Sequence, residues 1–241
     1  QQPDPPSPKQ LKFTQVFRDP VRNDAFWRYA RGYSVFLLGY QMYIVGLPYL
    51  VSAMTRNSLN ESHDPRVGNE EAIKALIRSN RSLARIAHWV SQALSYFTTP
   101  LFTRKAATEG PGKLLVRALL ARAALLAMVP VLFFSTGILG LGIGFGLLLT
   151  LFAAQSFFQG LSNTSEEGGK TRILAHPSVT ADERNKANSI LTFTAAVFSI
   201  IAPALAGQVS HIGPFLEKNG VGGAVIYAIY AGTTALTALI Y

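Results

Sequence analysis

Residues 123–161 read AALLAMVPVLFFSTGILGLGIGFGLLLTLFAAQSFFQGL and contain no Lys, Arg, Asp, Glu or His. A second uncharged stretch covers residues 190–210. An α-helix needs about 20 mostly apolar residues to cross the hydrocarbon core of a bilayer. Both stretches meet this need, and the first is long enough to contribute to two crossings. The sequence therefore predicts an all-α integral membrane protein.

The composition supports this fold class. Only 15% of the 241 residues are charged, whereas soluble domains average about 25%. The formal net charge is +9, but the basic residues flank the apolar runs, which is typical of anchors at membrane edges rather than of a nucleic-acid surface. We therefore expect a lipid bilayer and no nucleic acid as a partner. The absence of cysteine excludes disulfides, thiolate metal sites and a cysteine nucleophile.

The hydropathy pattern divides the chain into a tail and a bundle. Residues 1–31 form a polar N-terminal tail that ends in an interfacial segment rich in aromatic and basic residues. Residues 32–241 form a six-helix transmembrane bundle. The predicted spans cover residues 32–54, 83–103, 114–134, 138–161, 188–210 and 222–241.

The loop charges predict the orientation of a multi-pass protein. With the N-terminus inside, 13 basic residues lie inside and 7 lie outside. Cytoplasmic loops are enriched in Lys and Arg, so both termini are expected on the cytoplasm-like side. Most of the contrary charges belong to the first outer loop and its edge. In that loop, Asn69 can cap a helix with Glu70 and Glu71 in its first turn, and this helix can run into the second span.

Several polar side chains fall inside the predicted spans and are candidates to line a cavity. Gln155 and Gln159 are four residues apart and therefore share one helical face. Amides are costly against lipid and should point inward, where they either bind a solute or bridge helices. His88, the one histidine in a predicted span, either lines such a cavity or has a role in packing or at an interface. The candidates are Gln41, His88, Gln92, Gln155 and Gln159.

Other polar and glycine positions have structural interpretations. Arg117 and Arg122 lie toward one end of the third span and are expected to snorkel. The pair Gly140 and Gly144 suits close helix packing, and the surrounding run lacks the spacing of a nucleotide loop. Glu166 belongs either to a cytoplasmic helix end or to a polar cavity. No catalytic or metal-ligand motif is visible, so neither an enzyme nor a cofactor is expected.

The segment VTADERNKANSILTFTAAVFSIIAPALAG, residues 179–207, resembles the fourth-to-fifth helix region of the major facilitator superfamily. An acidic-Arg turn ends in Arg184, an Ala-Asn pair opens the helix, and Pro203 and Gly207 belong to a signature like that of drug and siderophore exporters. The helix count and spacing extend the resemblance over most of the chain. It implies that the chain is similar to the N-terminal six-helix half of such a transporter.

The loop between spans two and three departs from the family pattern. Where the family has a Gly and an Asp-Arg pair that help to gate the inward-facing state, this chain has threonines, and only Arg104 and Lys105 remain. The resemblance thus implies a degenerate gate. The residues that it marks as gating or packing candidates are Arg104, Lys105, Arg184, Pro203 and Gly207.

Two functions follow from the resemblance. The first is a half-size transport module for a small solute, with helices one, two, four and five lining the path. It needs a partner half, because alternating access takes place between two bundles. This half would be a second chain, a copy of the same chain or further residues of one polypeptide. The second function is a facilitator-derived accessory subunit that transports nothing and docks with other membrane subunits.

Overall fold

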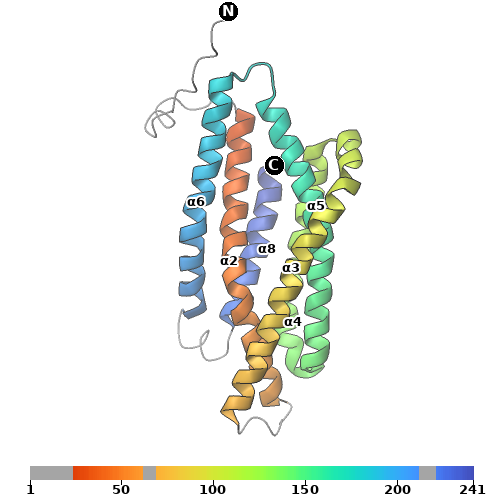
Figure 1. Ribbon diagram of the computed structural model, residues 1–241, viewed down its shortest axis with the longest axis vertical. Coiled ribbons are helices and arrows are strands. Elements are labelled where there is room, and N and C mark those ends of the chain that lie inside the picture. The colour runs from red at the N-terminus through yellow and green to blue at the C-terminus, as the bar shows by residue number, and fades with distance from the viewer. Residues whose placement is uncertain (1–23, 62–68, 212–220) are drawn as a thin grey trace, which may run out of the picture.

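The computed structural model describes residues 24–61, 69–211 and 221–241, and these residues form a bundle of long helices (Figure 1). In the described part of the chain the helices are α2 (Asp24–Glu61), α3 (Glu70–Glu109), α4 (Pro111–Leu139), α5 (Leu141–Leu174), α6 (Ala181–His211) and α8 (Gly222–Ile240).

Five of the described helices, α2, α4, α5, α6 and α8, are long and apolar enough to cross a membrane. The chain is therefore an all-helical, multi-pass membrane protein. At a rise of about 1.5 Å per residue, α2 and α5 are also longer than the roughly 30 Å hydrocarbon core. Their ends must extend beyond it. The predicted second span, residues 83–103, belongs to α3, which is not among the five.

The helix predicted within the first outer loop is confirmed. Asn69 has extended backbone angles and its side-chain oxygen accepts a hydrogen bond from the backbone N–H of Ala72, at 3.1 Å. The helix that begins there, α3, continues without a break to Glu109. Helix α2 begins at Asp24 rather than at residue 32, so residues 24–31 belong to the bundle and not to the predicted tail. The rest of that tail lies outside the described residues.

The predicted packing role of Gly140 is wrong. Gly140 lies between α4 and α5 with φ +77°, a backbone conformation that L side chains rarely adopt. Its N–H bonds to the carbonyl of Thr136 at 2.9 Å, which closes the end of α4. The glycine therefore makes the turn between two spans, and α5 begins at Leu141 instead of near Ile138.

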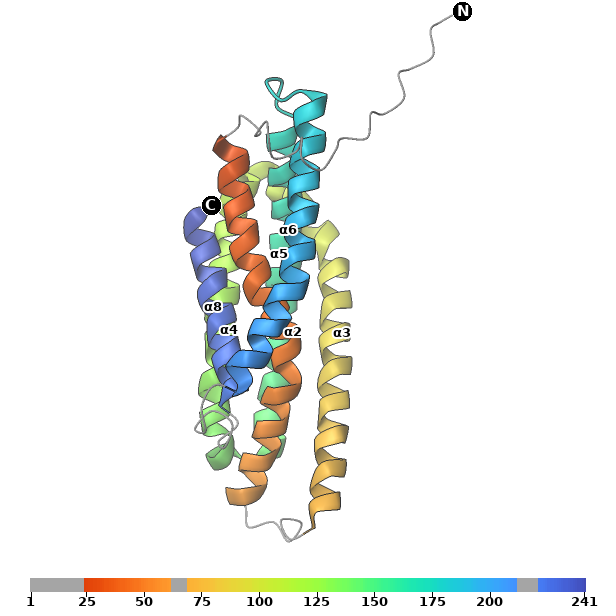
Figure 2. The same ribbon diagram turned by 90° about the vertical axis from the view of Figure 1, so that its left-hand side faces the viewer.

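Helix α2 lies at the centre of the arrangement. It packs chiefly against α8 and also against α6, while α4 packs against both α5 and α8. Helix α3 packs chiefly against α5 and much less against α2. Figure 2 shows α8 and α4 at one edge of the bundle and α3 at the other. The start of α2 and the end of α8 meet, since the rings of Tyr29 and Tyr241 stack with centroids 5.8 Å apart.

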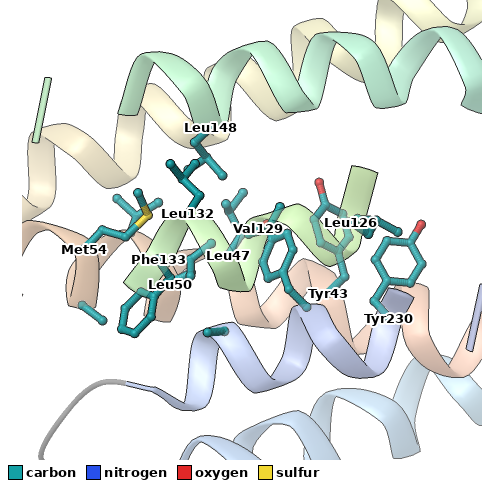
Figure 3. Close-up of a cluster of buried hydrophobic side chains, with 14 of the residues drawn as sticks. Tyr43, Leu47, Leu50, Met54, Leu126, Val129, Leu132, Phe133, Leu148 and Tyr230 are labelled. Carbon is teal, nitrogen blue, oxygen red and sulfur yellow. The ribbon is translucent and has the colours of Figure 1, made fainter. Parts of the chain in front are cut away.

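The main core lies between α2, α4, α5 and α8. Figure 3 shows leucines and Met54 at one end of this core, and Tyr43 and Tyr230 together at the other. Helices α2 and α8 approach each other closely where Gly223 faces Leu50. A Cβ built on this glycine would lie 2.5 Å from the backbone nitrogen of Leu50. The absence of a side chain at Gly223 therefore allows the α2–α8 contact.

Two sides of the bundle differ in how far they are covered. In the most apolar 18-residue stretch of α8, 50% is buried within the bundle, whereas only 22% of the corresponding stretch of α6 is buried. Large apolar side chains are exposed on α3, such as Phe97 at 77%, and also on α4, such as Phe134 at 66%. We call the outward surfaces of α3 and α6 the α3–α6 side. The part of the bundle that α4 and α8 form is the α4–α8 side.

Candidate functional site

A cavity of about 590 Å³ lies between α2 and α3. Its volume is in the range of pockets that hold small molecules. Aromatic and apolar side chains make most of the wall, and a few polar groups interrupt it, which is the usual composition of a ligand site. The residues that the argument uses are Tyr40, Arg85, His88, Trp89, Gln92 and Tyr96.

His88 is fixed by a residue of the core. The Tyr43 hydroxyl and His88 Nδ1 are 2.6 Å apart, and the two rings meet edge to face with centroids 5.4 Å apart. Tyr43 itself is 2% exposed. The histidine ring is therefore held at the wall of the cavity by a partner that has little freedom to move.

Gln92 and Gln159 form a reciprocal pair between α3 and α5. Gln159 Nε2 donates to Gln92 Oε1 at 2.7 Å, and Gln92 Nε2 donates to Gln159 Oε1 at 3.4 Å. Gln155, one turn before Gln159, is buried as well, which agrees with the shared helical face predicted from their spacing. Of the two roles left open for the amides, helix bridging is observed for this pair, and Gln92 also lines the cavity.

The five cavity candidates do not all meet. His88 and Gln92 line the α2–α3 cavity, and Gln159 joins them through its bond to Gln92. Gln41 is half-buried on α2 and does not belong to the cavity wall. Gln155 is buried, and it too lies outside the wall.

The structure contradicts the predicted snorkelling of Arg122. This side chain is 1% exposed. Its Nη1 donates to Ser162 Oγ at 3.0 Å and its Nη2 donates to the Tyr230 hydroxyl at 2.8 Å. The guanidinium carbon lies 5.2 Å from the centre of the Phe36 ring, which is a cation–π distance. Arg122 thus ties α4 to α2, α5 and α8, and we call these four residues the arginine cluster.

Arg117 differs from Arg122, since its side chain is 72% exposed and its Nη1 donates to a Glu109 carboxylate oxygen at 3.4 Å. The difference from Arg122 follows from helix geometry. Positions five residues apart point about 140° from each other, so one of them faces the bundle when the other faces outward. This spacing is the signal in the sequence that marks one of the two arginines as buried.

Glu166 resolves an alternative that the sequence left open. Helix α5 continues past it to Leu174, and Glu166 Oε1 accepts a hydrogen bond from the Tyr29 hydroxyl at 3.0 Å. The side chain of Glu166 is half-buried. Glu166 therefore belongs to the interior polar groups.

The gating and packing candidates lie at helix ends or in α6. Lys105 pairs with Glu109 at 3.8 Å, and Arg184 Nη2 donates to the Val179 carbonyl at 3.3 Å. Arg104 belongs to α3, but its side chain lies outside the described part. Pro203 lies inside α6. A Cβ built on Gly207 would meet no heavy atom within 4 Å, so the predicted close packing there is not made by another described helix of this chain.

The geometry of the described residues thus gives a candidate binding cavity between α2 and α3 and an enclosed arginine cluster. Comparisons with models of protein families, with curated proteins and with solved structures find no match for this chain.

Proposed function

We propose that this chain is a half-size transport module for a small solute and that it works with a partner half. The observation that supports this proposal most is the α2–α3 cavity, because it places His88 and Gln92 at the wall of a space of about 590 Å³. The resemblance to the facilitator family assigns the solute path to helices one, two, four and five. In this structure those are α2, α3, α5 and α6.

The proposal includes α3 as a sixth span. The side of α3 that faces the bundle carries Ala84, Ser91 and Ser95, all buried. The side that faces outward carries large apolar residues such as Ile86 and Phe97. In water the apolar side of a helix turns toward the core. Helix α3 has the opposite arrangement, which suits a helix with lipid or another protein outside it. The polar residues on its inward side lower the mean hydropathy of α3.

The partner half is needed because a single bundle has no opposing wall. In facilitator-like transport, the site lies between two bundles that move against each other. Polar groups such as Gln92 and Arg85 at an open cavity would otherwise face lipid, which is costly. The exposed aromatic residues of the α3–α6 side are suitable contacts for that second bundle.

A second candidate function is supported by the hydrogen bonds at the same place. Gln92 and Gln159 satisfy each other, and His88 is bonded to Tyr43. The amide and imidazole groups at the cavity are therefore already paired and need no solute to satisfy them. This pairing favours an accessory subunit that transports nothing and packs against unrelated membrane proteins.

The experiment that separates the two functions begins with the complex extracted in mild detergent. Its mass is measured, its proteins are identified, and both the complex and the isolated chain are reconstituted into liposomes for solute uptake. Uptake by the complex together with a second six-helix bundle supports the transport module. A dry contact with unrelated subunits and no uptake supports the accessory role. Uptake by the isolated monomer contradicts the need for a partner half.

A further inference from the structure

A second cavity, of about 370 Å³, lies near the junction of α2 and α3, at the end of the bundle opposite the meeting of Tyr29 and Tyr241. Five of the residues that line it are basic, and none is acidic. We call them the basic pocket. They are Arg56 from α2, and Lys74, Arg78, Arg81 and Arg85 from α3.

The α3 members of the basic pocket follow one another at intervals of four, three and four residues. This spacing places Lys74, Arg78, Arg81 and Arg85 on one face of the helix. Like charges at such spacing repel each other and destabilise a helix by a few tenths of a kcal/mol per pair. The row therefore has a cost for folding, which an anion bound in the pocket would remove.

The charge of the pocket is largely uncompensated within the described chain. Lys74 lies 3.7 Å from Glu70 and 3.6 Å from Glu71, and these carboxylates are themselves exposed. Arg56, Arg78 and Arg85 form no ion pair with any described residue.

One arginine of the pocket is held in place. Arg81 Nε donates to Ser52 Oγ at 2.6 Å, which joins α3 to α2 across the pocket. Only one of its five N–H groups is used by this bond. The remaining N–H groups are available in a fixed planar fork, the geometry that recognises phosphate oxygens.

The predicted orientation places seven basic residues on the outer side, against the usual charge bias of loops. The basic pocket contains five of these seven. Scattered basic residues on the outer side would argue against the predicted orientation. Convergence into one pocket gives them a separate reason to be there. Arginine side chains grouped in this way recognise phosphate oxygens, whether a lipid headgroup or a soluble ester carries them.

We propose that the basic pocket binds a phosphate group carried by an anionic ligand. Two sources have this chemistry: the headgroup of an anionic phospholipid at the membrane surface, and a soluble phosphate ester. Arg85 lines both the basic pocket and the α2–α3 cavity, so a soluble ester bound here would lie at the entrance of the proposed solute path. The binding itself does not depend on transport.

The test uses the full chain, purified in detergent with its partners where these co-purify. Phosphatidylglycerol, phosphatidylcholine and glycerol 3-phosphate are titrated separately, and binding is followed by thermal unfolding and by native mass spectrometry. The double variant R56Q/R78Q removes two charges from the pocket without touching the α2–α3 cavity. The control variant K113Q/R172Q removes two exposed charges elsewhere in the chain.

Phosphatidylglycerol is expected to bind more tightly than phosphatidylcholine. The R56Q/R78Q variant should bind it about thirtyfold more weakly, and K113Q/R172Q should bind it normally. If glycerol 3-phosphate binds more tightly than phosphatidylglycerol, with the same dependence on the arginines, the ligand is a soluble ester. Equal binding of both lipids together with no binding of the ester overturns the proposal, as does an equal loss in the two variants.

Discussion

Arg122 and Gln92 are both polar side chains within long helices of one bundle, but their surroundings differ. Arg122, on the α4–α8 side, is 1% exposed and is held by partners from other helices. Gln92, on α3, has one side-chain partner and lines the α2–α3 cavity. The comparison separates a polar site that this chain encloses from one that it leaves open. Function is expected at the second.

The largest effect is expected from Arg122→Ala. This change leaves the hydroxyls of Ser162 and Tyr230 without their donor and opens a cavity among four helices. The free energy of unfolding should fall by about 3 kcal/mol. Arg122→Lys keeps the charge but lacks the planar guanidinium group. This change should therefore lower the free energy of unfolding by an intermediate amount. Thermal or denaturant unfolding in mild detergent measures both.

The matched control is Arg117→Ala, in the same helix. Arg117 is 72% exposed, so its removal should change the free energy of unfolding by less than about 1 kcal/mol. Equal losses at the two positions would contradict the burial of Arg122.

The second effect tests the closest helix contact of the α4–α8 side. In Gly223→Ala the new methyl group would overlap the backbone of Leu50. A Cβ at position 223 would lie 2.5 Å from the nitrogen and 2.6 Å from the Cα of Leu50. Overpacking of this kind costs about 1–3 kcal/mol. Gly232→Ala in the same helix is the control, because a Cβ there meets nothing within 4 Å. It should be neutral or stabilise by up to about 1 kcal/mol. A Gly223→Ala protein as stable as Gly232→Ala would show that α2 and α8 are farther apart.

The third effect concerns the glutamine pair. Gln92→Leu or Gln159→Leu alone leaves the other amide without its partner, at a cost of about 1–2 kcal/mol. The double change removes both polar groups and should cost less than the sum of the single changes. A double-mutant cycle on the unfolding free energy measures this coupling. Strict additivity would mean that the two amides do not bond.

The smallest effect on the chain itself is expected at exposed apolar positions. Phe97 on α3 is 77% exposed and Leu239 on α8 is 79% exposed. Phe97→Ser and Leu239→Ser should each change unfolding by only about 0.5 kcal/mol. Only Phe97→Ser should weaken the association with a partner, measured by the mass of the detergent-extracted complex. Equal effects on association would remove the distinction between the two sides.

Local features of the sequence predicted helices well, because the information lies within a few residues. The cap at Asn69, the acidic first turn of α3 and the uncharged runs all correspond to described helices. Gly140 was misjudged because a glycine between two apolar runs suits both a packed helix and a turn. Only the backbone angle, φ +77°, distinguishes them.

The candidate site was less accessible from the sequence, because its contacts join distant helices. Polar residues could be identified, but the pairing of Gln92 with Gln159 requires that α3 lie against α5. The row from Lys74 to Arg85 is visible in the sequence, whereas its meeting with Arg56 requires the fold. Arg122 could have been found from its spacing to Arg117, although its partners could not.

The measurement that tests the half-transporter account most directly is site-specific cross-linking in the native membrane. The chain has no cysteine, so a single cysteine can carry a photo-activated cross-linker at position 97 on α3 or at position 138 on α4. Both side chains are exposed, at 77% and 91%. The account predicts that position 97 cross-links to a second six-helix bundle, while position 138 reaches only lipid. Cross-linking of both positions to lipid alone would contradict it.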